Sequence, residues 1–223
     1  MSEAAPGGFY LSKHRLEALT DGIFAVAMTL LVIELKIPET AQIATQEQLI
    51  AAVLHLIPKF MAWLISFFVL AIFWAGHHRL FHYVRVIDTK LTWLTIGYLA
   101  CASLIPFSSA LSGEYSGTLF SQIFYSANMA LLGMMSLLKS RHVHLHPALC
   151  STPMPVSVFK GAQVRMIGLI AIAVVAVLIT WALPNMGSIG NAAFMLMIVF
   201  GKISRRVEAR HANEKSETNF LNT

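Results

Sequence analysis

A succession of long apolar stretches constrains this chain more than any other feature. Six predominantly hydrophobic stretches follow one another along the sequence: 19–37, 49–75, 91–111, 118–138, 162–183 and 189–203. A helix of about 20 apolar residues spans the hydrocarbon core of a bilayer. Hydrophobic residues make up 57% of the chain and charged residues 12%, which excludes a soluble globule, a disordered chain and a typical nucleic-acid-binding domain. We therefore predict an all-α membrane protein with six transmembrane helices.

The basic residues are distributed unevenly between the loops that join these stretches. If the loops alternate between the two sides of a membrane, only Lys36 and Lys59 of the 16 Lys and Arg lie opposite the N-terminus. Positive residues accumulate on the cytoplasmic side, so both termini are predicted to be cytoplasmic and the protein to lie in the plasma membrane. We divide the chain into an N-terminal tail (1–12), a six-helix transmembrane domain (13–205) and a polar C-terminal tail (206–223).

The opposite side collects acidic residues instead. Those assigned to the outer side are Glu34, Glu39, Glu47 and Glu114. They are interpreted either as solvated loop charges or as a weakly negative outer mouth that concentrates cations.

The cytoplasmic end of the first helix holds polar groups that are unusual so close to hydrocarbon. Arg15, Thr20 and Asp21 lead directly into its apolar part. An intramembrane carboxylate is costly unless it has partners, which makes Asp21 a candidate functional residue. Alternatively, Asp21 is a first-turn acid that the helix dipole favours.

Candidate partners for Asp21 lie at the end of the second stretch. Residues 73–82 read Phe-Trp-Ala-Gly-His-His-Arg-Leu-Phe-His and are predicted to lie at the same membrane level as Asp21. Trp74 can donate a hydrogen bond through its indole N–H, and His77 or His78 through an imidazole nitrogen. The alternative is that these side chains anchor the helix at the membrane interface.

Helical spacing separates a second, purely apolar stripe on the first helix. Val26, Leu30 and Ile33 share one face, about 140° from Asp21 at 100° per residue, and Thr29 lies beside them. On a lone helix such a stripe contacts lipid or core. The stripe lines a path through the membrane only if copies of this helix meet at a symmetry axis.

The histidines raise the question of a metal centre. His78 and His82 form an H-x-x-x-H pair. A second group is assigned to the loop after the fourth stretch: His142, His144 and His146. Alternate residues cannot share one helical face, so we predict no metal site. The sequence has no phosphate loop or nucleophile motif, so we predict no enzyme. Cys101 and Cys150 are interpreted as free thiols.

The start of the first helix carries a family resemblance. Residues 15–21 read Arg-Leu-Glu-Ala-Leu-Thr-Asp. This run is similar to the R-x-x-x-F-S-D signature of the transmembrane protein 175 family of potassium channels, prokaryotic branch. Leu19 replaces the Phe of that signature and Thr20 its Ser, both conservatively.

Further segments extend the resemblance over most of residues 13–205. Residues 73–81, Asp88 and Trp93 also resemble this family. Thr95 stands where the family usually has Asn, which removes one expected polar contact.

The resemblance implies an assembly and roles for the residues already singled out. It implies a homotetramer whose pore is lined by the first helix of each chain. A ring of bulky apolar side chains, and not backbone carbonyls, would form the constriction: Val26, Leu30 and Ile33, with Thr29 nearby. The motif would tether the first helix to the second: Arg15, Thr20 and Asp21, with Trp74 and with His77 or His78.

The implied function is passive, potassium-preferring conduction without a cofactor. The permeant ion would be K+, the partners other copies of the chain and the lipid bilayer, with no nucleic acid. Glu34 at the outer mouth would concentrate cations. One alternative stays open, a proton-coupled carrier in which Asp21 and the His77/His78 pair form a proton relay.

Overall fold

The computed structural model describes residues 12–36, 45–183 and 193–195, and over these residues the chain is helical apart from loops and one isolated bridge between Val84 and Cys150. The elements are α1 (Lys13–Ile33), α2 (Gln46–His55), α3 (Ile57–Phe81), α4 (Thr89–Ser103), α5 (Ile105–Glu114), α6 (Leu119–Leu145), η1 (Pro147–Leu149), α7 (Val156–Ala182) and η3 (Ala193–Met195). The predicted C-terminal tail, nearly all of the N-terminal tail and most of the sixth apolar stretch lie outside the described residues.

Two predicted spans are interrupted, and a proline explains each interruption. The second stretch divides into α2 and α3 at Leu56, and Pro58 occupies the first turn of α3. The third stretch divides into α4 and α5 at Leu104, and Pro106 occupies the first turn of α5. Proline has no N–H to donate and its ring clashes with the carbonyl four residues earlier, so a helix tolerates it only near its start.

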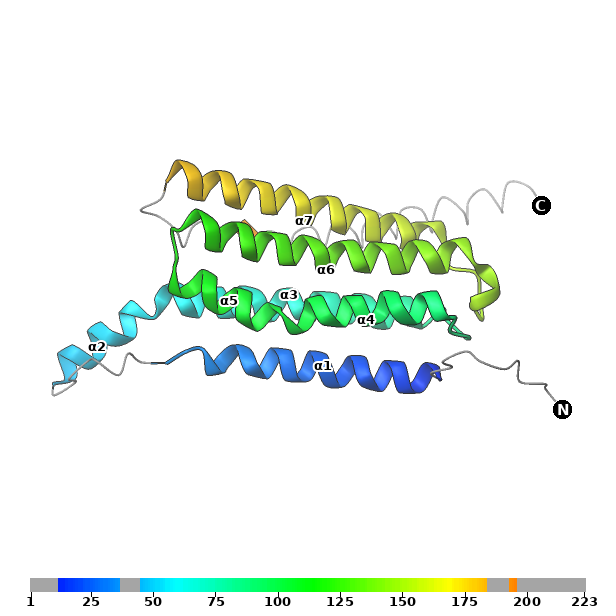
Figure 1. Ribbon diagram of the computed structural model, residues 1–223, viewed down its shortest axis with the longest axis horizontal. Helices are drawn as coiled ribbons and strands as arrows, with labels where there is room; N and C mark the ends of the chain where they lie inside the picture. Colours follow the sequence, from blue (N-terminus) through cyan, green and yellow to red (C-terminus); the bar gives the residue numbers. More distant parts are fainter. Residues whose placement is uncertain (1–11, 37–44, 184–192, 196–223) are drawn as a thin grey trace, which may run out of the picture.

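The long helices form one bundle in which α1 and α7 lie at opposite edges (Figure 1). α6 packs against α4, α5 and α7, whereas α1 contacts α3, α4 and α5. Buried side chains from α1, α3, α4, α5, α6 and α7 share the main apolar core, including Phe24, Tyr98, Met129 and Leu169. α2 projects beyond one end of the bundle (Figure 1). The pattern leaves α1 covered on one side only.

Four stretches of the described chain are long and apolar enough to cross a bilayer: α1, α3, α4 with α5, and α7. α6 is 27 residues long but more polar, because Gln122, Asn128 and Lys139 lie on it, and all three are buried among neighbouring helices. The prediction of an all-α, multi-pass membrane fold is confirmed.

Candidate functional site: the apolar face and polar anchor of α1

The two sides of α1 differ sharply in exposure. One side packs into the bundle through Leu16, Thr20, Phe24, Ala27 and Leu31. On the other side, Val26 is 56% exposed, Leu30 42% and Ile33 52%. These three residues form the apolar stripe that helical spacing places on a different face from Asp21. We call this stripe the outer face of α1.

The surface beside the outer face is hollowed. An apolar groove of about 390 Å³ is lined by side chains that include Leu19, Val26 and Leu30 of α1, with Ser103 of α4. Thr29 is also exposed, but its hydroxyl donates to the carbonyls of Ala25 and Val26 at 3.0 and 2.9 Å. The exposed surface of this helix is therefore mostly hydrocarbon.

Asp21 is anchored to α3 by two donors. The indole Nε1–H of Trp74 donates to Asp21 Oδ1 at 2.9 Å, and His78 Nε2 lies 3.1 Å from the same oxygen. The Trp74 and His78 rings meet edge to face, with centroids 4.5 Å apart. Two donors on one carboxylate oxygen hold α1 against α3, and they turn Asp21 away from the outer face.

The other two motif residues lie apart from this anchor. The Thr20 hydroxyl is buried and donates to the Leu16 carbonyl at 2.9 Å, within its own helix. Arg15 is exposed, and its backbone N–H donates to Ser12, the N-cap of α1. The structure thus brings Asp21, Trp74 and His78 together, without Arg15 or the Thr20 hydroxyl.

His77 lies on a different side of α3 from the Asp21 anchor. Its Nδ1 is 3.1 Å from the Nζ of Lys139 on α6, and both side chains are buried. The loop assignment places Lys139 among the cytoplasmic loop charges and does not predict this contact. The absence of Gly and Pro between Leu138 and Pro147 does indicate that the fourth helix extends through Lys139 to the histidines.

The same extension of α6 corrects the assignment of the three alternating histidines. His142 and His144 lie in the last turns of α6 and His146 is its C-cap, not residues of a free loop. His144 stacks on Phe159 of α7 with ring centroids 4.8 Å apart, and His146 Nδ1–H donates to the His142 carbonyl at 2.8 Å. Each ring therefore has its own contact within the chain.

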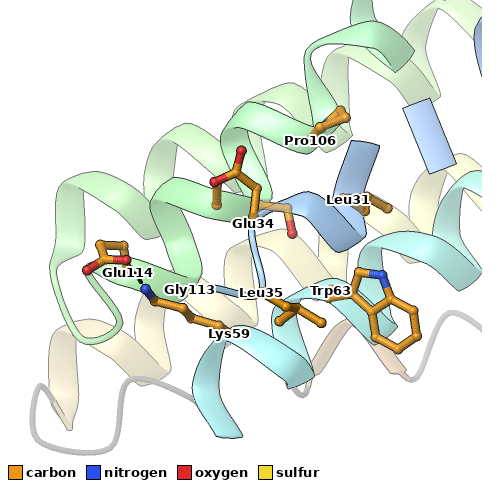
Figure 2. Close-up of a pocket in the computed structure, with 10 residues that line it drawn as sticks. Leu31, Glu34, Leu35, Lys59, Trp63, Pro106, Gly113 and Glu114 are labelled. Atoms are coloured by element: carbon orange, nitrogen blue, oxygen red, sulfur yellow. Dashed lines mark ion pairs between the residues drawn. The ribbon is translucent and has the colours of Figure 1, made fainter. Parts of the chain in front are cut away.

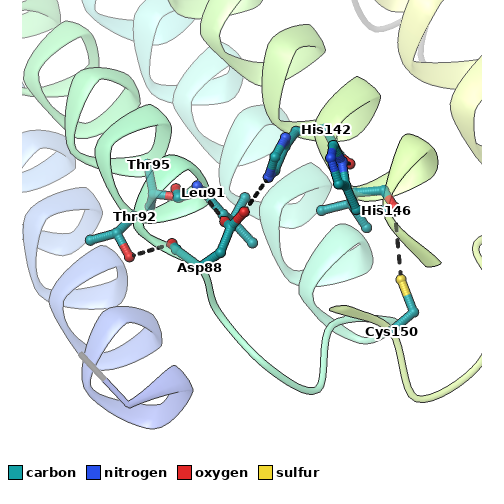
Figure 3. Close-up of polar contacts among 8 residues, drawn as sticks. Asp88, Leu91, Thr92, Thr95, His142, His146 and Cys150 are labelled. Atoms are coloured by element: carbon teal, nitrogen blue, oxygen red, sulfur yellow. Dashed lines mark hydrogen bonds and ion pairs between the residues drawn. The ribbon is translucent and has the colours of Figure 1, made fainter. Parts of the chain in front are cut away.

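Asp88 joins the start of α4 to the end of α6 (Figure 3). Its Oδ1 accepts from the Leu91 N–H at 2.8 Å as a helix cap, and its Oδ2 lies 2.7 Å from His142 Nε2. Partial burial raises the pKa of Asp88, but the Leu91 N–H, His142 and His146 lower it more, so its pKa lies below the ordinary 3.8.

The opposite end of the bundle brings together three of the charges assigned to the outer side. Of the others, Glu47 lies on α2 and Glu39 lies outside the described residues. Glu34 is the C-cap of α1, and Lys59 of α3 pairs with Glu114 of α5. All three line one small pocket, whose free volume of about 20 Å³ has room for about one water molecule (Figure 2). The ends of α1 and α5 and the start of α3 therefore lie together.

Neither the cysteines nor the histidines form a metal centre in the described part of the chain. Over residues 12–36, 45–183 and 193–195, no three His, Cys, Asp or Glu side chains are grouped as metal ligands. Cys101 lies in α4 and Cys150 follows η1, both as free thiols.

Comparisons with known proteins match this arrangement. A model of the family described as endosomal/lysosomal potassium channel TMEM175 matches residues 15–106. A potassium channel of Chamaesiphon minutus is 38% identical over 101 residues, 45% of this chain and 49% of that protein. The endosomal/lysosomal proton channel TMEM175 of Homo sapiens is 32% identical over 101 residues, 43% of this chain and 20% of that protein. The crystal structure of a lysosomal potassium-selective channel TMEM175 homolog from Chamaesiphon minutus superposes with a TM-score of 0.69 at 26% identity, covering 86% of this chain and 97% of that chain. The resemblance to the TMEM175 family is confirmed.

The sequence matches to TMEM175 proteins cover only part of this chain and part of its relatives. The chain spans about half the length of the prokaryotic curated relatives it matches. Residues 15–106 run from α1 into the start of α5 and contain both the outer face and the Asp21 anchor. Lys139 and α7 lie beyond the residues that the family model matches.

Proposed function

We propose that this chain is a subunit of a potassium-preferring cation channel, in which copies of α1 line a passive conduction path. The observation that carries this proposal is the outer face of α1. The buried face of α1 and the Asp21 anchor hold this helix against the bundle. Its exposed apolar face is therefore free to face a symmetry axis between copies of the chain.

The constriction is proposed at Val26, Leu30 and Ile33. Rings of bulky apolar side chains gate by expelling water, and an ion passes only when the ring is wide enough to hold part of its hydration shell. K+ binds its water less tightly than Na+, so such a ring favours K+. The Thr29 hydroxyl, which donates to backbone carbonyls, leaves the ring mainly apolar.

The distribution of charged residues indicates how the conduction path is oriented in the membrane. Glu34 ends α1 and is exposed, so copies of it would raise the local cation concentration at the outer mouth. The distribution of Lys and Arg supports six spans with cytoplasmic termini in the plasma membrane. We propose a homotetramer in the lipid bilayer that conducts K+ and has neither a cofactor nor an enzymatic activity.

The structural relation of the two histidines favours a channel over a proton-coupled carrier. A relay through Asp21 and the His77/His78 pair needs both rings on one proton path. Only His78 reaches Asp21, at 3.1 Å, whereas His77 Nδ1 lies against Lys139 Nζ. The names of the prokaryotic relatives, all potassium channels, support the same choice.

The test is ion flux through the full chain reconstituted in vesicles. K+, Na+ and H+ gradients are imposed separately, and ion-selective electrodes and a pH dye follow their decay. We expect K+ flux without a proton gradient, at a rate above that of Na+. The Leu30→Ala variant should raise flux about threefold or more and weaken the preference for K+, because a smaller ring stays wet.

Leu178→Ala provides the matched control. Leu178 is an exposed leucine on α7, at the opposite edge of the bundle, so the same truncation there should leave flux and selectivity unchanged. Equal K+ and Na+ flux would refute potassium preference. Proton flux alone, K+ movement only with a proton gradient, or no flux would refute the proposed channel.

A further inference from the structure

Lys139 is a charged side chain in the interior of the bundle. It is 1% exposed, and its Nζ lies 3.1 Å from His77 Nδ1 and 3.2 Å from the centroid of the Tyr98 ring. Among the described residues, no carboxylate forms an ion pair with it. A buried ammonium is costly unless other groups replace its water, and here the face of an aromatic ring and an imidazole nitrogen do so.

The contact fixes how His77 uses its two nitrogens. To accept a hydrogen bond from the Lys139 ammonium, Nδ1 must be unprotonated, which puts the ring proton on Nε2. Nε2 is buried and has no hydrogen-bond partner among the described residues. With Lys139 as an ammonium, His77 is therefore the neutral acceptor of this contact, and its Nε2–H is an unpaired donor.

Tyr98 connects this cation to three other helices. From α4, its hydroxyl donates to the Phe73 carbonyl of α3 at 2.8 Å. Its ring faces Lys139 of α6 on one side and lies 5.5 Å from the ring of Phe24 on α1. The side chains of Lys139, His77, Tyr98 and Phe24 form a chain of contacts, which we call the cation-aromatic core.

The cation-aromatic core ends directly behind the outer face of α1. Phe24 is buried, and Val26 follows two residues later, about 200° around the helix at 100° per residue. Because a helix moves as a rigid rod over about two turns, a displacement of Phe24 displaces Val26 and Leu30 as well. The position of the proposed constriction therefore depends on what fills the space behind Phe24.

We propose that Lys139 is a positioning residue for ion selectivity: its buried ammonium, seated on Tyr98, sets the position of α1 and thereby the width of the apolar ring. The inference rests on the proposed function. It assigns a role in selectivity to a residue that neither lines the path nor touches the outer face.

The test compares Lys139→Met with Lys139→Arg in reconstituted vesicles. Met keeps a long side chain without charge, whereas Arg keeps a cation that can stack on Tyr98. We expect the Met variant to change the ratio of K+ to Na+ flux about threefold or more. The Arg variant should stay within about twofold of the wild-type ratio. Lys160→Met, at an exposed lysine of α7, is the matched control and should not change the ratio.

Phe24→Leu tests the other end of the core with a smaller change. It trims the ring that Tyr98 contacts and leaves Lys139 in place. We expect it to shift the flux ratio in the same direction as Lys139→Met, and the double variant to shift it by less than the product of the two single effects, because both act through Tyr98. If Lys139→Met yields no assembled protein, Phe24→Leu and Lys139→Arg decide the question.

The outcomes separate the two levels of the proposal. If wild-type protein does not conduct K+, the proposed function fails first. If wild-type protein conducts selectively but Met and Arg at position 139 give the same ratio, the charge of Lys139 has no such role. An assembled Phe24→Leu variant with the wild-type ratio would equally overturn the inference while leaving the channel intact.

Discussion

The hydrogen bonds that α3 donates to Asp21 allow a quantitative test of how α1 is held. In the anchor interpretation, Asp21 stabilises the fold, so removing it should lower stability and assembly. In the relay interpretation, its loss should abolish proton coupling and leave a well-assembled protein. A double-mutant cycle with Asp21→Ala and Trp74→Phe separates the two, because Phe keeps most of the apolar ring and removes only the indole N–H.

The geometry sets the expected magnitude. Trp74 Nε1 and His78 Nε2 lie 2.9 and 3.1 Å from Asp21 Oδ1, and a hydrogen bond to a charged group contributes about 1.5–3 kcal/mol when buried. The Asp21 side chain is 49% exposed, so screening reduces each bond to about 1 kcal/mol. Asp21→Ala should therefore destabilise by about 2 kcal/mol and Trp74→Phe by about 1 kcal/mol, with a coupling of about 1 kcal/mol between them.

The assay is thermal unfolding of the detergent-purified protein, with oligomeric state followed by size-exclusion chromatography. For a chain of this size, about 1 kcal/mol corresponds to about 2–4 °C in melting temperature. Additive effects of Asp21→Ala and Trp74→Phe, with no coupling, would refute the direct anchor. A fully stable, assembled Asp21→Ala protein would favour a role for the carboxylate other than holding α1.

Two further predictions concern other contacts in the bundle. The carboxylate of Asp88, whose pKa is lowered on folding, contributes stability that is present above pH 3.8 and is lost as the pH falls through the lower folded value. Asp88→Asn keeps one oxygen for the Leu91 N–H, places an uncharged NH2 against His142 and cannot titrate, so the melting temperature of this variant should lack this acid dependence. Gly133→Ala would place a Cβ 2.6 Å from Leu169 on α7 and should lower stability by about 1–2 kcal/mol through overpacking. Gly76→Ala, where a Cβ meets no atom within 4 Å, is the control and should not lower the melting temperature; equal effects of the two alanines would contradict the packing explanation.

Residue type and spacing alone establish the class of fold and the division of α1 into faces. Several apolar stretches of about 20 residues each are typical of helices that cross a bilayer. The helical period of 3.6 residues places Val26 and Leu30 on one side of α1 and Asp21 on another. These are local properties, since they depend only on residue type and spacing. The helix interruptions at Pro58 and Pro106 are local in the same sense, because each proline acts on its own helix turn.

The packing of helices that are distant in sequence determines which polar groups meet. Adjacent residues His77 and His78 have separate partners, Lys139 and Asp21, because neighbours on a helix point about 100° apart and face different helices. The burial of Lys139 likewise depends on α3 and α4 supplying an imidazole and an aromatic face from residues 62 and 41 positions earlier in the chain. Such pairings join segments distant in sequence, so neither hydrophobic periodicity nor charge counting could specify them.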